Sequence, residues 1–309
     1  MAQNMSGPQS LLARERNATD GFIIVAVLWI LGALSAMVSI YAVFVIDTAS
    51  GFAEHDDRLR AQALVTAAIE LTVYRQLTAI GARPTQGEFS IRLGRANVGV
   101  AFRSEAARID LNAAPKQLLA GLFRALGARA SEADQYADRV IGWRTAPQNG
   151  QDPEATVYQS AGLSHRPRGA KFPHVNELSL IRLIPVELLE RALPFVTVYS
   201  GRPQINVIDA APVVLAALPG MTPERVEAVL AQRRAVPEKR QAVLQLLGAS
   251  QQYATTEGSR AFRVTVRIAF DNGRNALAEV VILILEGGTE PYAILSWLDG
   301  AEALRAGSP

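Results

Sequence analysis

An uninterrupted apolar segment near the N-terminus constrains the fold of this chain more than any other feature. Residues 22–46 are 25 consecutive amino acids, none of which is charged. A helix needs about 20 apolar residues to cross the hydrocarbon core of a bilayer. The segment is too long for the ~7–15-residue apolar region of a cleaved secretory signal, and no small-residue cleavage site follows it. We therefore predict a transmembrane helix over residues 22–46.

Charged residues on the two sides of this segment predict its orientation. Arg14 and Arg16 precede the segment. The first charged residues after it are acidic, namely Asp47, Glu54 and Asp56. Because loops rich in arginine and lysine stay on the cytoplasmic side of a membrane, we predict a single-pass protein with a cytoplasmic N-terminus. The residues after the segment then lie on the other side.

The composition of the whole chain excludes several classes of protein. The 309 residues are 49% hydrophobic and 19% charged, a balance that rules out intrinsic disorder. The absence of cysteine excludes disulfide bonds, zinc fingers, thiol catalysis and iron–sulfur ligation, and three histidines are too few for a multi-histidine metal site. A net charge of +2 is too small to indicate nucleic-acid binding. The sequence contains no glycine-rich phosphate loop or nucleophile motif, so we predict no enzymatic activity.

Beyond the apolar segment, the hydrophobic pattern predicts an α+β fold. Residues 22–80 are predicted to form one long N-terminal helix. Residues 81–111 and 255–298 contain alternating apolar and polar side chains, which predicts an antiparallel pilin-like sheet built from segments far apart in the sequence. Residues 112–254 repeat apolar side chains at helical spacing, so we predict a large inserted helical domain there. Residues 299–309 are predicted to form a C-terminal tail.

Two predicted helix starts inside the insertion resemble each other. Asn-Ala-Ala-Pro at residues 112–115 and Asp-Ala-Ala-Pro at residues 209–212 each place a polar residue shortly before a proline. A polar side chain can accept hydrogen bonds from the free amides of a helix, and proline is tolerated in the first turn. We therefore predict that Asn112 and Asp209 cap the two helices.

Residues 215–233 predict a helix-hairpin-helix, with Pro-Gly-Met at residues 219–221 as the hairpin. In such a unit the glycine allows a tight turn, and the amides of the second helix are free to hold a phosphate. The basic cluster of this region lies beyond the hairpin, at Arg233, Arg234, Lys239 and Arg240. Two interpretations stay open, namely phosphate binding and a packing unit without a ligand.

Asp152 and Glu154 lie in a predicted loop over residues 145–160 that is rich in turn-forming residues. Calcium takes about six or more oxygen ligands, several of them carboxylates. Two carboxylates are a small part of such a set. The alternatives are therefore a calcium site and a solvated surface loop.

The junction of Gly21 and Phe22, where a short polar leader meets the apolar segment, resembles the processing site of a type IV prepilin. The fifth residue after this junction, a glutamate in the major subunits of that family, is Ala26 here. The missing glutamate is characteristic of one class, the K-type minor pseudopilin of type II secretion systems (general secretion pathway protein K). The order and spacing of residues 108–115, 205–212 and 218–220 are similar to that class as well.

This resemblance implies that residues 1–21 are a leader removed by the prepilin peptidase, and that Phe22 is then methylated. It implies a non-enzymatic subunit that is anchored in the inner membrane and lies mostly in the periplasm. Such a subunit joins other minor pseudopilins at the tip of the pseudopilus, where it helps initiate assembly and protein export. Ile23, Val27 and Leu31 would then pack against neighbouring helices.

The K-type class often carries a more acidic version of the 145–160 loop, associated with Ca²⁺, and this sequence departs from that version. A protein of another class is the alternative, a membrane-anchored DNA receptor with helix-hairpin-helix motifs. That alternative accounts for residues 215–233 but not for the predicted sheet or the junction at Gly21. Nucleic acid is therefore the less favoured partner.

Overall fold

The computed structural model describes residues 12–147, 153–182, 184–235 and 240–300. The chain divides into two compact units, Met1–Gln62 and Ala63–Pro309. Helix α1 (Leu12–Leu77) contributes residues to both units, whereas every strand and all the other helices belong to the second.

Helix α1 has different ends from those predicted. It begins at Leu12 rather than at residue 22, because residues 12–20 contain leucine, alanine, arginine and glutamate, which favour helix, and neither glycine nor proline. It ends at Leu77 rather than at residue 80. Gly81 follows with a φ of 85°, a left-handed conformation that interrupts a helix.

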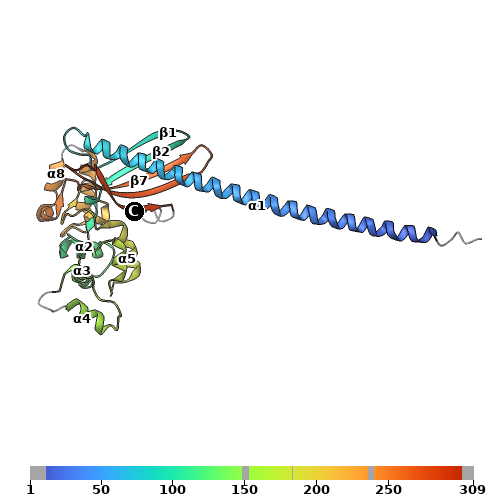
Figure 1. Ribbon diagram of the computed structural model, residues 1–309. Helices are drawn as coiled ribbons and strands as arrows, with labels where there is room; N and C mark the ends of the chain where they lie inside the picture. The colour runs from blue at the N-terminus through green and yellow to red at the C-terminus, as the bar shows by residue number, and fades with distance from the viewer. Residues whose placement is uncertain (1–11, 148–152, 183, 236–239, 301–309) are drawn as a thin grey trace, which may run out of the picture. The chain divides into compact units, whose positions relative to one another are not determined.

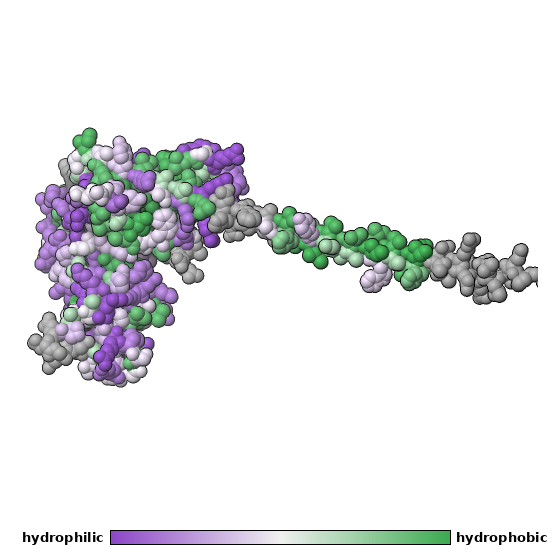
Figure 2. Space-filling model, viewed as in Figure 1, coloured by the Kyte–Doolittle hydropathy of each residue, from purple (hydrophilic) through white to green (hydrophobic). Residues whose placement is uncertain are grey.

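The first unit carries the apolar segment. Phe22–Val45 lies within α1 and has a mean hydropathy of 2.6. None of the residues in its most apolar part is buried. Figure 2 shows hydrophobic side chains around this part of the helix with few polar interruptions. Among the residues that the structure describes, it is the one helical segment that is long and apolar enough to cross a membrane, as a single-pass anchor does.

The second unit is built on a five-stranded sheet. Its strands, in spatial order, are β1 (Gln86–Leu93), β2 (Ala96–Ser104), β7 (Ala261–Phe270), β8 (Asn275–Ile284) and β9 (Tyr292–Asp299). All neighbouring strands are antiparallel. Strands β2 and β7 are adjacent although residues 105–260 separate them, so the prediction of a sheet from distant segments is confirmed (Figure 1).

One face of the sheet is apolar and buried. Val100 of β2 lies opposite Val266 of β7, and Val264 lies opposite Val280 of β8, all almost without solvent exposure. The part of α1 that belongs to this unit lies across the sheet (Figure 1). That part of the helix buries side chains three or four positions apart, which is the spacing of a single helical face: Val65, Ala68, Ile69, Thr72 and Val73.

The inserted segment is mainly helical. Its helices are α2 (Lys116–Ala125), α3 (Ala130–Arg144), α4 (Pro153–Ser160), α5 (Val186–Ala192), α6 (Pro212–Ala216), α7 (Pro223–Ala235) and α8 (Arg240–Gln245). Short 3-10 helices accompany them at Glu105–Ala107, Val175–Leu180, Leu193–Phe195 and Gly248–Tyr253.

Two small parallel sheets correct the predicted limits of the insertion. Strand β3 (Ile109–Asp110) pairs with β4 (Val196–Thr197), and β5 (Ile205–Asn206) pairs with β6 (Ala254–Thr255). Because β3 and β6 pair inside the insertion and not with the large sheet, the insertion spans residues 105–260 rather than 112–254. The alternating pattern used for the prediction does not say with which strand a segment pairs.

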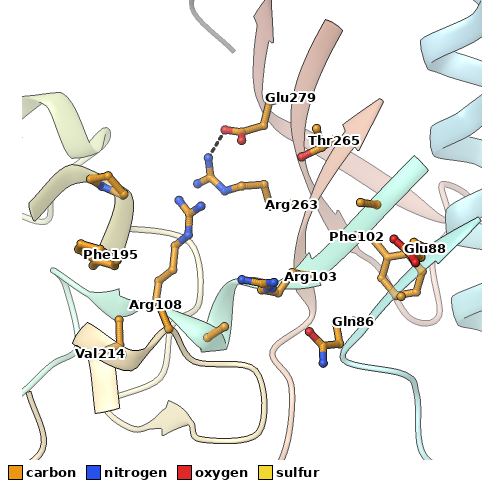
Figure 3. Close-up of a pocket in the computed structure, with 15 residues that line it drawn as sticks. Gln86, Glu88, Phe102, Arg103, Arg108, Phe195, Val214, Arg263, Thr265 and Glu279 are labelled. Atoms are coloured by element: carbon orange, nitrogen blue, oxygen red, sulfur yellow. Dashed lines mark hydrogen bonds and ion pairs between the residues drawn. The ribbon is translucent and has the colours of Figure 1, made fainter. Parts of the chain in front are cut away.

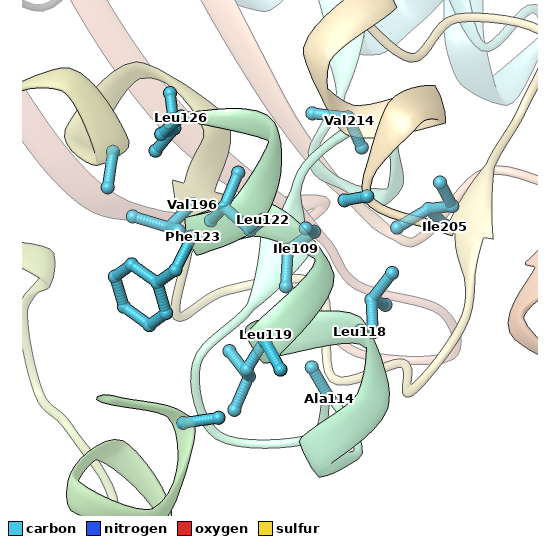
Figure 4. Packing of buried hydrophobic residues seen from close by; sticks show 14 of the residues in the cluster. Ile109, Ala114, Leu118, Leu119, Leu122, Phe123, Leu126, Val196, Ile205 and Val214 are labelled. Carbon is cyan, nitrogen blue, oxygen red and sulfur yellow. The ribbon is translucent and has the colours of Figure 1, made fainter. Parts of the chain in front are cut away.

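The core of the insertion centres on α2. Leu118, Leu119, Leu122 and Phe123 of this helix are almost fully buried. Figure 4 shows them surrounded by residues from several elements of the insertion, among them Ile109, Val196, Ile205 and Val214. Burial of these large side chains is the main stabilising contribution, at about 1.5–3 kcal/mol for each side chain.

The insertion contains two helical pairs of similar construction. The first helical pair is α2 and α3, and the second is α6 and α7. Each pair follows a two-residue strand and the tripeptide Ala-Ala-Pro, and the chain of each pair turns at a glycine with positive φ. That glycine is Gly127 in the first pair (φ 95°) and Gly220 in the second (φ 72°). Assignment of the second pair to the helix-hairpin-helix class stays a prediction.

An arginine at the end of each helical pair reaches back to the start of the pair. Arg144 donates hydrogen bonds to the carbonyls of Leu111 and Ala114, at 2.7 Å for the second. Arg233 donates to the carbonyl of Ala210 at 2.8 Å, and more weakly to two neighbouring carbonyls. Burial lowers the pKa of both guanidinium groups. Each arginine thus satisfies backbone acceptors that the loop itself leaves free.

The predicted helix caps are wrong. The N-cap positions are Pro115 and Ala211, and neither makes a side-chain cap hydrogen bond. The Asn112 amide instead bonds the backbone of Phe172 in both directions, at 2.7 and 3.0 Å. Asp209 accepts a hydrogen bond from Asn206 at 2.8 Å. These polar side chains therefore fix the loops before the helices rather than the helix ends.

The two helical pairs are in close contact at Gly121. A Cβ atom added to Gly121 of α2 would lie 1.8 Å from the carbonyl oxygen of Ala217, which follows α6. Glycine is unfavourable in the middle of a helix. Here it allows the two backbones to touch, which no other residue type permits.

Candidate functional site

The residues predicted for helix packing lie on the exposed apolar helix. Ile23, Val27 and Leu31 follow one another at intervals of four along α1, and the side chain of each is about half exposed or more. A shallow groove lies on the opposite side of the helix. It is lined by Val25, Leu28, Trp29, Gly32, Ala33 and Ala36. The helix therefore has two different faces that could pack against other helices, and the packing role of the first face stays a prediction.

The predicted processing junction lies in the same helix. Gly21 and Phe22 both have helical backbone, and the Phe22 side chain is 75% exposed. Cleavage between them stays a prediction. Ala26, which occupies the position of the missing glutamate, belongs to the same helical segment.

Of the two predicted cation ligands, the structure describes Glu154. Asp152 lies outside the described residues. Glu154 lies in the first turn of α4, is buried and pairs with Arg139 of α3 at 2.9 Å. Gly142 leaves room for this carboxylate, since a Cβ atom there would lie 2.6 Å from its Oε2. Glu154 is thus engaged by an arginine, and the described part of the chain contains no group of three or more metal-ligating side chains. A calcium site that includes Asp152 stays a prediction.

Two arginines near the predicted hairpin are used within the fold, whereas Lys239 of the basic cluster lies outside the described residues. Arg233 is occupied by backbone carbonyls at the start of the second helical pair. Arg225 donates to the Gly220 carbonyl in the turn itself, at 3.3 Å. Glu224 lies in the first turn of α7, where its negative charge disfavours a phosphate. This arrangement favours the packing interpretation of residues 215–233 over phosphate binding.

A pocket of about 590 Å³ lies between the outer face of the sheet and the insertion. Residues of β1, β2, β7 and β8 form its floor, including Ala101 and Thr265, whose small side chains leave it hollow. Pro194, Phe195, Ala211 and Val214 of the insertion form an apolar wall. Figure 3 shows Arg108 extending through the space, with Phe195 on one side and Arg103 on the other.

A buried ionic cluster closes the inner end of this pocket. Arg263 of β7 donates to Glu105 at 2.8 Å and also pairs with Glu279 of β8. Thr197 donates its hydroxyl to Glu105 as well. Both carboxylates are at most 3% exposed. The cluster joins the start of the insertion to the middle of the sheet.

The electrostatics of the cluster keep Glu105 ionised. Burial alone would raise the pKa of Glu105, but the charges of Arg263 and Arg108 and the hydrogen bonds from Arg263 and Thr197 hold it below its usual value. For Arg263, the two carboxylates outweigh the effect of burial and raise its pKa.

Arg108 differs from Arg263 in having no fixed partner. Burial, and next the positive charge of Arg263, lower the pKa of the Arg108 guanidinium to about 10. Within the described residues, the side chain of Arg108 makes no hydrogen bond and no ion pair, and the same is true of the Arg103 side chain. Two guanidinium groups with free donors therefore face the same pocket.

Sequence reasoning missed this pocket and its cluster. Arg263 alternates with apolar residues in its strand and looks like an ordinary solvent-facing side chain. The available signal was Glu279, a single charge inside the nearly continuous apolar run at residues 277–285. A charge buried in such a strand requires a partner, because an unpaired charge is costly to remove from water.

Comparisons with known proteins agree with this architecture. Residues 95–201 match the model of a family described as type II secretion system (T2SS), protein K. A chain in the crystal structure of the GspK-GspI-GspJ complex from the type 2 secretion system of enterotoxigenic Escherichia coli has a similar fold, with a TM-score of 0.59 and 17% sequence identity. The similarity covers 80% of this chain and 98% of that chain. No curated protein matches the chain in sequence.

Proposed function

We propose that this chain, whose residues 95–201 match the model of protein K of type II secretion systems, is such a protein and acts at the tip of a periplasmic pseudopilus. In this position it helps initiate pseudopilus assembly and thereby protein export. The observation that carries the proposal is the combination of an exposed apolar helix with a pilin-like sheet that bears a large insertion.

The insertion supports a terminal place in the fibre. Subunits within a pilus-like fibre stack repeatedly, so each must be narrow enough to admit neighbours above and below. Residues 105–260 add a second core of packed helices to the sheet. A subunit of that width fits the end of a stack better than its middle.

The position of Ala26 supports the same place. In the family's major subunits, a glutamate at this position offers a charge to the amino terminus of a neighbouring subunit. A subunit at the top of the fibre needs one such contact fewer. Ala26 is consistent with that position, and a buried, unpaired charge in the membrane would be costly.

We expect the partners to be other minor pseudopilins. The similar structure is a complex of GspK with GspI and GspJ, and the likeness of fold extends over most of this chain. In this proposal the bulk of the chain lies in the periplasm and residues 22–46 anchor it in the inner membrane. The prepilin peptidase would remove residues 1–21 and the new terminus at Phe22 would be methylated. The role is non-enzymatic.

Copurification of the full chain with the other minor pseudopilins of its system, in detergent, tests this proposal. We expect a heteromer of fixed stoichiometry, and a chain that stays alone would contradict the proposal. Mass spectrometry of the membrane-purified protein tests the processing step. We expect a methylated N-terminal Phe22, with the unprocessed chain in a Gly21→Val control, whereas an intact Met1 in the unmodified protein would contradict processing.

A further inference from the structure

The pocket between sheet and insertion has the features of a binding site. Its volume of about 590 Å³ falls in the range of ligand pockets, about 300–1,000 Å³. It holds a basic side and an apolar side. Arg103 and Arg108 form the basic side, and Phe195 with Pro194 and Val214 forms the apolar side.

Two guanidinium groups of the pocket take no part in its ion pairs. Glu105 and Glu279 both pair with Arg263, and this one guanidinium is the ion-pair partner of both carboxylates. Glu88 also lines the pocket, but no ion pair links it to Arg103 or Arg108 in the described part of the chain. The side chains of Arg103 and Arg108 therefore keep their donors free in the same space.

We propose that this pocket binds a carboxylate side chain of a partner subunit, held between Arg108 and Arg103, with an adjacent apolar residue of the partner against Phe195. A guanidinium group recognises a carboxylate through two parallel hydrogen bonds, which gives both strength and direction. The apolar wall excludes water from those bonds and strengthens them. The inference rests on the proposed function, because it assumes that partner subunits exist.

The position of the pocket favours a chain segment over a free small molecule. Gln86, Gly87 and Glu88 of the pocket belong to β1, which is an edge strand of the sheet. The backbone groups on the outer side of an edge strand are free to pair with another chain. A partner segment that runs along this edge can place one acidic side chain in the pocket.

The test uses the full chain in detergent and its purified partner subunits. We expect Arg108→Gln and Arg103→Gln each to raise the dissociation constant of the complex by about 10- to 100-fold, the range for a hydrogen bond between charged groups. Arg267→Gln is the matched control, because Arg267 is exposed on the same strand as Arg263 but lies outside the pocket. It should change the constant less than 2-fold, about the size expected for an exposed charge.

Arg103 is exposed, so its replacement leaves the fold intact even if Arg108→Gln proves unstable. If both variants bind the partners as tightly as the unmodified chain, the inference is overturned. If the unmodified chain binds no partner, the proposed function fails first and for a different reason.

A second measurement distinguishes the source of the carboxylate. The dipeptides N-acetyl-Glu-Leu-amide and N-acetyl-Gln-Leu-amide are titrated into the full chain by calorimetry. We expect the glutamate form alone to bind, and to compete with the partner subunits for the pocket. If the glutamate form binds without displacing the partners, the pocket takes a free carboxylate and the partner segment is excluded as its occupant.

Discussion

The two helical pairs of the insertion share one plan but differ in how they are joined to the rest of the molecule. The first pair follows Glu105, whose carboxylate is tied to Arg263 in the sheet. The second pair follows β5, which is joined to β6 by backbone hydrogen bonds, extended by Val207 to Thr255 at 3.0 Å. The first pair also follows a paired strand, since β3 pairs with β4 as β5 pairs with β6. The comparison teaches that the first pair adds an ionic attachment to this backbone pairing. Side-chain substitutions should therefore affect the first attachment far more.

Removal of the ionic attachment should have the largest effect. Arg263→Met leaves Glu105 and Glu279 buried without their shared cation, so we expect a loss of about 3–5 kcal/mol in the free energy of unfolding. Chemical unfolding of the detergent-solubilised chain measures it. Arg92→Met is the control, because its pair with Asp271 is exposed and should contribute less than about 1 kcal/mol. Equal losses in the two variants would show that the cluster is not a special attachment.

The contact between the two pairs should come next. Gly121→Ala places a methyl group against the Ala217 carbonyl, so the two backbones must separate, and we expect a loss of about 3 kcal/mol. Gly99→Ala serves as control, since the nearest atom to a Cβ there lies 3.8 Å away. A lower unfolding temperature for Gly99→Ala than for Gly121→Ala would refute the close contact.

The two arginines that close the pairs allow a direct comparison. Arg144→Met and Arg233→Met each release backbone carbonyls, and we expect a loss of about 2 kcal/mol for each. The double variant shows whether the pairs are independent. If the losses add within about 0.5 kcal/mol, the pairs are energetically separate. A clear departure from additivity would mean that they behave as one body.

Acidification should weaken the first attachment selectively. The pKa of Glu105 is lower in the folded chain than in the unfolded chain, so its contribution to stability is complete above the ordinary glutamate pKa, about 4.5. That contribution is lost as the pH falls through the lower, folded value. We expect the stability difference between the unmodified chain and Glu105→Gln to shrink below about pH 4. Parallel curves down to pH 3 would contradict this assignment.

The turn glycines should have the smallest effect and a similar one in both pairs. Gly127 and Gly220 have positive φ, and no atom lies within 4 Å of a Cβ at either position. Replacement by alanine thus costs only the backbone conformation, about 1 kcal/mol. Thermal unfolding of Gly127→Ala and Gly220→Ala should give matching shifts. A much larger shift in one variant would show that its turn has a role beyond chain reversal.

Much of this fold follows from local patterns. The apolar anchor segment follows from an unbroken apolar run. The strands β2 and β7 and the helical insertion follow from the periodicity of their apolar residues. The limits of the insertion were less accessible, because a two-residue strand such as β3 carries no period. The caps at Asn112 and Asp209 were misjudged because a polar side chain before a helix can equally well bond a distant backbone group, as Asn112 does with Phe172.

The pocket could not be predicted because its parts meet only in three dimensions. Arg108 and Phe195 lie in different elements of the insertion, and the sheet supplies Arg103 and Arg263. Nothing local to any of these residues indicates the others. Glu154 shows the converse, since its sequence setting suggested a cation ligand and the fold pairs it with Arg139.

The two ends of the insertion meet at a single place on the sheet. Ser104, at the end of β2, lies opposite Phe262 of β7 and accepts a hydrogen bond from the amide of Ser259 at 2.8 Å. Residues 105–260 thus connect two adjacent antiparallel strands, as the loop of a β-hairpin does. The entropy cost of closing such a loop grows only slowly with its length. The insertion therefore joins the sheet at one place only. Replacement of residues 105–260 by a shorter or different segment at this one junction would leave the strand order of the sheet unchanged, so the insertion can vary without rebuilding the sheet.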